Sequence, residues 1–309
     1  MKISKPKFWL DEKIGVISIL LFPFSFLFLI IHTIKRKLSL EKKFKIPIIC
    51  VGNIYVGGTG KTPLSIRIAN KIKNNKKTVI IRKYYKNHKD EYELIKHNTN
   101  LLFSSNRVKA VQLAEKNNFD IAILDDGFQD YSLKKDLNII CFNSNQLIGN
   151  GLVLPSGPLR ERLDSIKRAK IVIINGDKNK IFEQKLINIS NNIKIFYTNY
   201  LPLDIDRFKN KKIFAFAGIG NPNNFFETLK KYNLNIKKTM SFPDHYEYKK
   251  FEIDDIFDYA KKNGLQTLTT EKDYYRIKHM GINNIEYLKV ELQIYREDEF
   301  FDQILKNLW

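Results

Sequence analysis

Short apolar runs alternate with amphipathic stretches along most of this chain. Most of the runs are rich in Ile and Val, residues that suit strands buried on both faces of a sheet. They occur at residues 46–51, 78–81, 101–103, 119–124, 138–142 and 169–175. Stretches with apolar residues at helical spacing lie between them, as at 65–69 and 107–117. This alternation predicts an α/β fold: a doubly wound, mostly parallel sheet that binds ligands at the carboxyl ends of its strands.

A second, smaller α/β domain is predicted towards the C-terminus. Apolar runs at 213–217 and 267–270 read as strands, and the first of them ends in a glycine turn. Amphipathic helices are expected at 224–231 and 251–262, where apolar positions repeat at helical spacing. We expect this domain to cover residues 206–309.

The most apolar stretch, residues 14–34, contains no Asp, Glu, Lys or Arg. About 20 apolar residues can cross a bilayer core. Pro23 weakens a simple straight span, although membrane helices tolerate proline. Lys35, Arg36 and Lys37 follow at once and place the rest of the chain on the cytoplasmic side. We expect residues 1–36 to form a membrane-associated segment, either a spanning helix or an in-plane anchor; a buried core helix is the alternative.

Composition narrows the class of partner. The net charge is +20, from 53 Lys+Arg against 33 Asp+Glu. Such a charge favours anionic partners: nucleotide phosphates, nucleic acid or an acidic membrane surface. The sequence contains no aromatic–basic RNA-binding motif, so we expect no nucleic-acid partner. The two cysteines, Cys50 and Cys141, lie in strand-like runs, which leaves neither a disulfide framework nor a cysteine metal cluster.

The first predicted strand runs into a glycine-rich turn that can bind phosphate. In a strand–loop–helix context, glycines let backbone N–H groups close on the phosphates, a lysine adds positive charge, and a hydroxyl can hold magnesium. A tyrosine stands where the strict motif has its first glycine, so the loop is a variant; a plain glycine-rich turn is the alternative. We predict that a nucleotide is bound within a P-loop domain at residues 37–205, by Tyr55, Val56, Gly57, Gly58, Thr59, Gly60, Lys61 and Thr62.

Three further features are candidate site residues. Asp125 and Asp126 end the predicted strand 119–124, where a carboxylate can orient Mg²⁺ opposite a phosphate-binding loop. Arg160 ends a loop rich in glycine and proline and is a candidate anion contact; the start of a solvated helix is the alternative. The pair Asp244-His245 stands out among only five histidines, although such a pair is more often structural than catalytic.

These motifs together resemble the lipid A 4′-kinase (tetraacyldisaccharide 4′-kinase) family. They run in the family's order across nearly the whole chain, after a hydrophobic N-terminal segment that the family also has. The matches are VGN-x-x-VGGTGKTP at Val51–Pro63, DDGFQ at Asp125–Gln129, GNG-x-x-LP-x-GPLRE at Gly149–Glu161, FAGIGNP at Phe216–Pro222, FPDH at Phe242–His245 and TEKD at Thr270–Asp273.

The resemblance implies transfer of the γ-phosphate of ATP to the 4′-hydroxyl of a lipid-linked disaccharide phosphate at the cytoplasmic face of the inner membrane. It implies no obligate protein partner. Lys61 would hold the β- and γ-phosphates, and Thr62 with Asp125 or Asp126 would organise Mg²⁺. Asp90 would be the base on the acceptor hydroxyl and His245 its partner. We assign substrate binding to Arg107, Arg160, Glu91 and Asp244.

The chain departs from the family pattern around the predicted base. The family's Gly-Asp-Glu-Pro motif reads Lys-Asp-Glu-Tyr at residues 89–92, and its Ser-Arg-Gly-Tyr-Gly loop reads Ile-Arg-Lys-Tyr-Tyr at 81–85. The predicted domains place Asp90 and His245 on different domains, so we expect domain closure to assemble the site and guard against ATP hydrolysis.

Two rival functions remain on the sequence alone. A membrane-tethered P-loop GTPase, or a metallochaperone-type NTPase, would need a guanine-reading Asn/Thr-Lys-x-Asp motif. Thr270-Glu271-Lys272-Asp273 is close to that motif but lacks its spacing. The second rival is a basic binding module for membranes or nucleic acid whose phosphate-binding loop has lost its activity. Preference for ATP over GTP, and phosphate transfer that depends on a lipid acceptor, separate the kinase from both.

Overall fold

The structure of the chain is a computed structural model that describes residues 6–11, 13–85, 89–244, 246–282 and 285–309, with the backbone alone for residues 89 and 90. It divides into two compact units. The larger unit comprises Ile3–Tyr84, Asn98–Asn199 and Leu292–Trp309. The smaller unit is built from Tyr85–His97 and Tyr200–Glu291. The chain therefore passes between the units four times.

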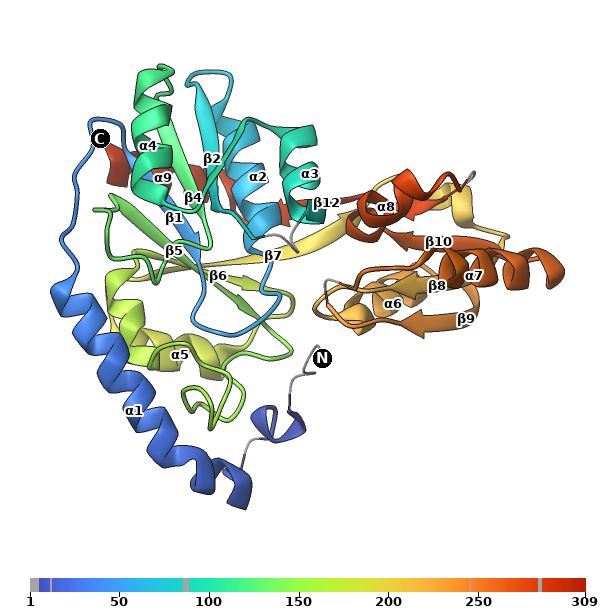
Figure 1. The fold of residues 1–309 in the computed structure, drawn as a ribbon, viewed down its shortest axis with the longest axis horizontal. Coiled ribbons are helices and arrows are strands. Elements are labelled where there is room, and N and C mark those ends of the chain that lie inside the picture. Colours follow the sequence, from blue (N-terminus) through green and yellow to red (C-terminus); the bar gives the residue numbers. More distant parts are fainter. Residues whose placement is uncertain (1–5, 12, 86–88, 245, 283–284) are drawn as a thin grey trace. The chain divides into compact units, whose positions relative to one another are not determined.

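An eight-stranded sheet organises the larger unit (Figure 1). The six pairs of adjacent strands from β7 to β3 are all parallel. Its central strands are fully buried, as their Ile-rich and Val-rich sequences require. Across the sheet, the order is β12 (Val290–Ile294), β7 (Lys194–Pro202), β6 (Ile171–Asn175), β5 (Leu137–Asn143), β1 (Ile48–Gly52), β4 (Ile121–Asp125), β2 (Thr78–Lys83) and β3 (Leu101–Ser104).

Helices connect and cover these strands. Helix α2 packs on β1, β2 and β4, and α4 packs on β2 and β3. The chain runs from β1 outwards to β2 and β3, returns through β4, and then continues on the other side of β1 with β5. This reversal makes the carboxyl end of β1 the expected ligand position. The helices of this unit are α1 (Val16–Leu38), α2 (Lys61–Ile72), α4 (Arg107–Lys116), α5 (Lys180–Ile189) and α9 (Glu297–Leu308), with short 3-10 turns at Lys7–Trp9 and Leu163–Arg168.

The smaller unit has its own parallel sheet in the order β11 (Tyr287–Leu288), β10 (Gln266–Thr270), β8 (Lys212–Ala217) and β9 (Asn235–Ser241). Separate apolar clusters lie on its two faces, one around Phe226 and one around Ile253. Its helices are α3 (Lys89–Asn98), α6 (Pro222–Lys231), α7 (Lys250–Lys262) and α8 (Glu271–Ile277), with 3-10 turns at Ile205–Phe208 and Lys278–Met280.

The predicted fold class is confirmed: a doubly wound, mostly parallel sheet, a second smaller α/β unit and an N-terminal apolar helix. The two units differ from the contiguous domains 37–205 and 206–309 in three segments, the shortest of which is residues 200–205, in the smaller unit. Residues 292–309 belong with the larger unit, because Phe300 of α9 packs edge-on against Phe196 of β7. Residues 85–97 belong with the smaller unit, because Glu91 and His97 of α3 contact α8.

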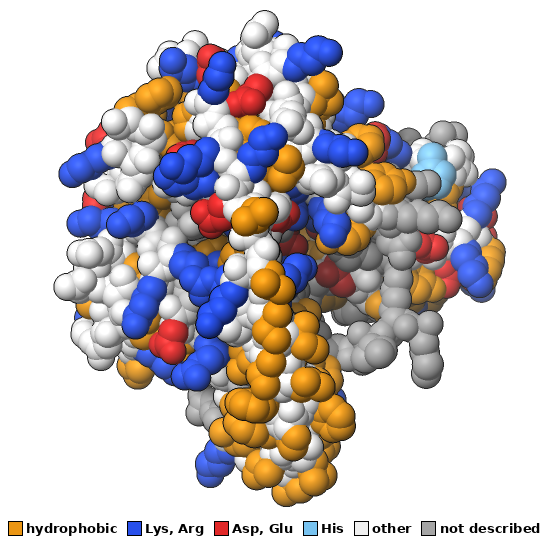
Figure 2. All heavy atoms as spheres, turned by 60° about the vertical axis from the view of Figure 1, so that its left-hand side comes forward, with side chains coloured by type: hydrophobic (Ala, Val, Ile, Leu, Met, Phe, Trp, Pro, Cys, Tyr) orange, Lys and Arg blue, Asp and Glu red, His pale blue; other side chains and the backbone are white. Residues whose placement is uncertain are grey.

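Helix α1 is the one helix of the described residues that is long and apolar enough to cross a membrane. Only a narrow stripe of α1, where Ser18 and Ser25 are buried, faces the rest of the larger unit. The rest of its surface exposes Val16, Leu20, Phe24 and other large apolar side chains. Figure 2 shows these side chains gathered along the helix, with Lys and Arg side chains on the neighbouring surface. A buried core helix, the alternative that the sequence left open, does not fit this exposure.

Candidate functional site

The glycine-rich turn after β1 is shaped by its glycines and by one asparagine. Gly57 and Gly60 have φ values of 120° and 85°, in the region where glycine has no steric cost. The side-chain nitrogen of Asn53 lies 2.6 Å from the Tyr55 carbonyl oxygen, 3.2 Å from that of Gly57 and 3.1 Å from the Thr59 hydroxyl. These contacts fix the shape of the loop. The loop ends at Gly60, directly before the N-terminus of α2, where free N–H groups attract anions.

Lys61, the first residue of α2, faces charge rather than apolar packing. Its ammonium lies 3.7 Å from a carboxylate oxygen of Asp126, and Arg160 lies 3.0 Å from the same oxygen. Burial of Asp126 opposes its ionisation, but the charges of Lys61, Arg160 and Arg82 outweigh burial and hold the pKa of Asp126 well below its usual range. The side chains predicted from the loop, the DDGFQ motif and the GPLRE motif are thus brought together.

Asp125 forms a second cluster directly behind the loop. Its carboxylate is fully buried and lies 2.9 Å from the Thr62 hydroxyl and 3.3 Å from the Ser65 hydroxyl. Arg82 of β2 makes an ion pair with the same carboxylate and lies 3.0 Å from the Thr62 hydroxyl. Three cationic side chains, Lys61, Arg82 and Arg160, therefore face Asp125 and Asp126. The described part of the site carries a surplus of positive charge, as a polyphosphate site requires.

Arg107 supports the turn between β4 and β5. Its guanidinium lies 2.8 Å from the Asp126 carbonyl oxygen and 3.1 Å from an oxygen of Asp130, and only 8% of the residue is exposed. Contacts with Ser132 and Arg107 lower the pKa of Asp130 despite its burial. These contacts hold Asp126 in its left-handed conformation, with φ at 59°. A direct contact between Arg107 and substrate stays a prediction.

The smaller unit holds the acidic residues that we assigned to substrate. Lys272 of α8 lies 2.7 Å from Glu91 and 3.8 Å from Asp244. Lys272 thus joins the TEKD motif, the FPDH motif and α3 within one unit. His245 and the side chain of Asp90, the two predicted catalytic groups, lie outside the described residues.

The closure hypothesis loses its premise. It assumed that Asp90 and His245 belong to different domains. Helix α3, which carries Asp90, clusters with Tyr200–Glu291 because Lys272 and Lys278 pair with Glu91 and Glu93.

Asp273, the last residue of the TEKD motif, has a structural role. The carboxylate of Asp273 is fully buried and accepts hydrogen bonds from the Gly218 amide at 3.0 Å and from the Thr270 hydroxyl at 2.7 Å. It also accepts from Tyr248 and pairs with Arg276, at 3.0 and 2.7 Å. Asp273 therefore ties the end of β8 to the start of α8. This occupied carboxylate does not fit the guanine-reading role of the rival GTPase.

The sequence did not single out three residues that contact predicted site residues within their own unit. Arg82 ends β2 and lies in register with Asp125 of β4, so its contact depends on strand order and not on a local motif. Asn53 lies within the VGN stretch, but only the folded turn shows which groups its side chain holds. Lys272 was visible as part of TEKD, and its partners come from two distant segments.

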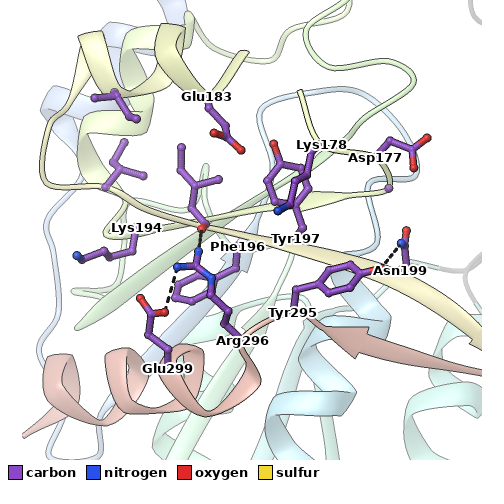
Figure 3. A pocket seen from close by; sticks show the side chains of 14 residues that line it. Asp177, Lys178, Glu183, Lys194, Phe196, Tyr197, Asn199, Tyr295, Arg296 and Glu299 are labelled. Atoms are coloured by element: carbon purple, nitrogen blue, oxygen red, sulfur yellow. Dashed lines mark hydrogen bonds and ion pairs between the residues drawn. The ribbon is translucent and has the colours of Figure 1, made fainter. Parts of the chain in front are cut away.

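A cavity of about 770 Å³ opens elsewhere in the larger unit, between β6, β7, α5 and α9. Figure 3 shows Arg296 at its centre, bonded to Glu299 and to the Ile195 carbonyl oxygen, and Asn199 bonded to Tyr295. None of its lining residues is one of the predicted site residues.

The fold and the site define a class. A glycine-rich loop between a buried strand and a helix, with a lysine at the helix start and a carboxylate at the end of the adjacent strand, is the arrangement of P-loop proteins that transfer phosphate. A family model described as tetraacyldisaccharide-1-P 4′-kinase (LpxK) matches residues 17–309. The chain therefore belongs to the tetraacyldisaccharide 4′-kinase family, whose members are ATP-dependent kinases, and the resemblance drawn from its motifs is confirmed.

Named relatives align with this chain over nearly their full length. A tetraacyldisaccharide 4′-kinase from Pelagibacter ubique is 42% identical over 310 residues, which cover 99% of this chain and 98% of the relative. One from Rickettsia canadensis is 34% identical over 329 residues, with coverage of 99% and 98%. Among solved structures, LpxK from Aquifex aeolicus in complex with ATP superposes with a TM-score of 0.75 at 27% identity, covering 95% of this chain and all of that one (100%).

Proposed function

We propose that this kinase transfers the γ-phosphate of ATP to the 4′-hydroxyl of an acylated disaccharide 1-phosphate, a lipid A precursor, at the cytoplasmic face of the inner membrane. The observation that carries the proposal is the pairing of two clusters at one strand edge: Lys61 with Asp126 and Arg160, and Thr62 with Asp125. Family membership supplies the acceptor, since relatives over the whole chain are tetraacyldisaccharide 4′-kinases.

Charge neutralisation is the main contribution of the phosphate site. Phosphoryl transfer requires little covalent chemistry from the protein, so positioning and electrostatic stabilisation supply most of the rate. The loop amides and the N-terminus of α2 would bind the β- and γ-phosphates, and Lys61 and Arg160 would hold charge that develops on the transferred group. The Asp126 carboxylate lies against both of these cations.

The residues behind the loop fit Mg²⁺. This ion prefers hard oxygen ligands and is commonly held by one or two carboxylates together with substrate phosphates. Thr62 and Asp125 offer a hydroxyl and a carboxylate 2.9 Å apart, and Asp126 is the adjacent carboxylate. When bound, Mg²⁺ would neutralise charge on the β- and γ-phosphate oxygens. Arg82 holds the Asp125 carboxylate in place from the other side.

We assign the acceptor side of the site to Asp90 as base, with His245 as its partner and Glu91, Asp244, Arg107 and Arg160 as substrate contacts. The Asp90 and His245 assignments rest on the family motifs. Lys272 adds to them, since it fixes Glu91 and Asp244 through ion pairs of 2.7 and 3.8 Å. A base is needed late in the step, when the acceptor hydroxyl loses its proton.

Replacing Asp90 by alanine is expected to lower turnover at least about a hundredfold, because general-base catalysis contributes a factor of that order. ATP affinity should change little, since Asp90 would act on the acceptor. Steady-state kinetics with both substrates and equilibrium ATP binding measure the two effects. Near-normal turnover would mean that Asp90 is not the base.

The way in which α1 is held supports a location at the membrane. Its protein-facing stripe runs from Ser18 to His32, which stacks edge-on against Tyr131. At 1.5 Å per residue this contact covers about 21 Å of helix, most of a hydrocarbon core about 30 Å thick. A spanning α1 would draw the irregular backbone of the loop at 149–158 into the hydrocarbon, where such backbone is not tolerated against lipid. We infer that α1 lies in the interface with its apolar face in the lipid, and that both of its ends stay cytoplasmic.

A cysteine at Lys13 tests this orientation. Cys50 and Cys141 are buried, so a Lys13→Cys variant carries one reactive thiol just before α1. We expect a membrane-impermeant maleimide to label this cysteine in inverted vesicles and not in intact spheroplasts. A cytoplasmic control, Lys209→Cys, should show the same pattern. Labelling of Lys13→Cys in spheroplasts would show that the helix crosses the membrane.

Acceptor-dependent turnover tests the function as a whole. The purified protein with Mg²⁺ and a monophosphorylated acyl-disaccharide in mixed micelles should consume ATP and form a bisphosphorylated lipid, detected by mass spectrometry. GTP should be a poor substitute. Strong preference for GTP, or nucleotide hydrolysis that ignores the lipid, would instead favour the NTPase alternative.

A further inference from the structure

Two serines are the buried residues of α1, a helix that is otherwise mostly apolar. The Ser25 hydroxyl donates to the Val153 carbonyl oxygen at 2.8 Å and accepts from the Ser156 amide at 3.0 Å. The hydroxyl oxygens of Ser25 and Ser156 also lie 2.8 Å apart. A hydroxyl has one hydrogen and two lone pairs, so these three contacts use the full hydrogen-bonding capacity of Ser25 when Ser156 donates.

The same loop makes a second attachment to the N-terminal segment. The Asn150 side chain donates to the Ser18 hydroxyl at 3.2 Å and to the Ser156 carbonyl oxygen at 3.0 Å. The backbone amide of Asn150 donates to the Trp9 carbonyl oxygen at 2.9 Å. Gly149 has a φ of 56°, and a β-carbon there would lie 2.2 Å from that carbonyl oxygen. The attachment therefore requires a glycine at this position.

The far end of this loop binds the phosphate-binding loop. The Val56 amide donates to the Pro158 carbonyl oxygen at 2.9 Å, and the Arg160 amide donates to the Ile54 carbonyl oxygen at 2.7 Å. Between these two bonds, Leu159 and Tyr55 form an antiparallel bridge, and both are fully buried. The guanidinium of Arg160 then reaches Asp126, the partner of Lys61.

We propose that residues 149–160, the bracket loop, carry the position of α1 to the phosphate-binding loop, and that Ser25 is a positioning residue for nucleotide binding and phosphoryl transfer. The bracket loop holds α1 with its first half and residues 54–56 with its second half. Its last residue supplies a cation to the site. This inference rests on the proposed function only for the identity of the nucleotide.

This arrangement has a consequence at the membrane. The face of α1 opposite Ser25 is the apolar one, so the bracket loop also fixes the height of the phosphate site above the lipid surface. An acceptor that is anchored by acyl chains presents its sugar hydroxyl at a set height. Residues far from the chemistry can then matter, because small errors in position have large effects on rate.

The Ser25→Ala variant tests the proposal in the full-length protein. Loss of the hydroxyl leaves the Ser156 amide and the Val153 carbonyl oxygen without their buried partner. We expect the dissociation constant for ATP with Mg²⁺ to rise about tenfold, the effect of losing one buried hydrogen bond. Hydrogen–deuterium exchange should accelerate in a peptide covering residues 53–60. Attachment to anionic phospholipid vesicles should stay as in the wild type.

Two controls separate positioning from general destabilisation. Thr33→Ala removes a hydroxyl of α1 that bonds only the Leu29 carbonyl oxygen of its own helix, and it should leave ATP binding and exchange unchanged. Ser156→Ala removes the loop's hydroxyl from the contact between Ser25 and Ser156. It should repeat the effects of Ser25→Ala in weaker form. It gives an independent reading if Ser25→Ala folds poorly.

Linkage supplies the reciprocal test, because two coupled sites affect each other equally. ATP with Mg²⁺, in the absence of acceptor and lipid, should slow exchange in wild-type peptides that contain Ser156. Equal ATP affinity and equal exchange at 53–60 in the wild type and in both serine variants would overturn the proposal. Such a result would leave the kinase function intact, whereas a wild type that forms no bisphosphorylated lipid would overturn the function and not the coupling.

Discussion

Replacing Lys61 by alanine is expected to abolish phosphate transfer while leaving membrane attachment intact. The loss of turnover should reach at least about a thousandfold, since cations that stabilise the transferred phosphoryl group are worth factors of that size. Lys61 is the first residue of α2 and its ammonium faces Asp126 at 3.7 Å. Single-turnover transfer from γ-labelled ATP measures the effect, and vesicle flotation measures attachment.

The control for this variant lies on the same helix. Lys71 is nearly three turns further along α2 and pairs with Glu297 at 3.3 Å on the surface, with 46% of its side chain exposed. Lys71→Ala removes an equal charge and should retain close to full turnover. A Lys61→Ala protein that keeps more than about a tenth of wild-type turnover would contradict the role of the loop.

Replacing Asp125 by asparagine is expected to produce the second-largest effect, a loss of turnover of at least about a hundredfold. The substitution keeps the size of the side chain but removes the charge that Thr62, Ser65 and Arg82 surround. The Mg²⁺ concentration needed for half-maximal rate should rise, because an amide oxygen is a weaker ligand for a hard cation than a carboxylate. Turnover measured across a series of Mg²⁺ concentrations tests both effects.

Stability must be followed in the Asp125→Asn variant. Arg82 is only 7% exposed at its side chain, and leaving a buried charge without its partner costs about 3–5 kcal/mol of unfolding free energy. Thermal unfolding identifies a temperature at which the variant is folded, and kinetics are compared there. Asp164→Asn, a change in an exposed ion pair with Arg162, is the matched control. Unchanged turnover and Mg²⁺ dependence at that temperature would remove Asp125 from the site.

The sequence predicted the parts of the fold whose signals are local. Buried strands such as Ile48–Gly52 are continuous apolar runs, and the glycine-rich turn that follows needs φ values that favour glycine. The order of strands and helices then gave the parallel sheet and the position of the phosphate-binding loop at its carboxyl edge.

The parts that the sequence missed depend on contacts between distant segments. Strand β7 is buried in its middle, at residues 196–198, and partly or fully exposed on either side of these residues, so its apolar pattern is short. Helix α9 is placed in the larger unit by the contact of Phe300 with Phe196. Helix α3 has a polar sequence, so no apolar pattern in it predicts where it packs. Its pairing with α8 through Glu91 and Lys272 explains its place in the smaller unit.

The same reasoning applies to the candidate site. Lys61, Thr62, Asp125 and Asp126 sit in recognisable motifs, and the structure brings them together. Arg82 resembles any basic residue at a strand end, and its contact with Asp125 follows from the neighbouring positions of β2 and β4. A single sequence does not contain that register, so this cation could not be predicted from a local pattern.

The position of the newly added phosphate on the lipid decides whether this protein is a 4′-kinase. Wild-type protein is incubated with γ-labelled ATP, Mg²⁺ and an acylated disaccharide 1-phosphate, and the lipid product is analysed by phosphorus and proton NMR. We expect one new phosphate monoester on the 4′-oxygen, formed by the wild type and not by Lys61→Ala. A phosphate at another position, or label released only as inorganic phosphate, would contradict it.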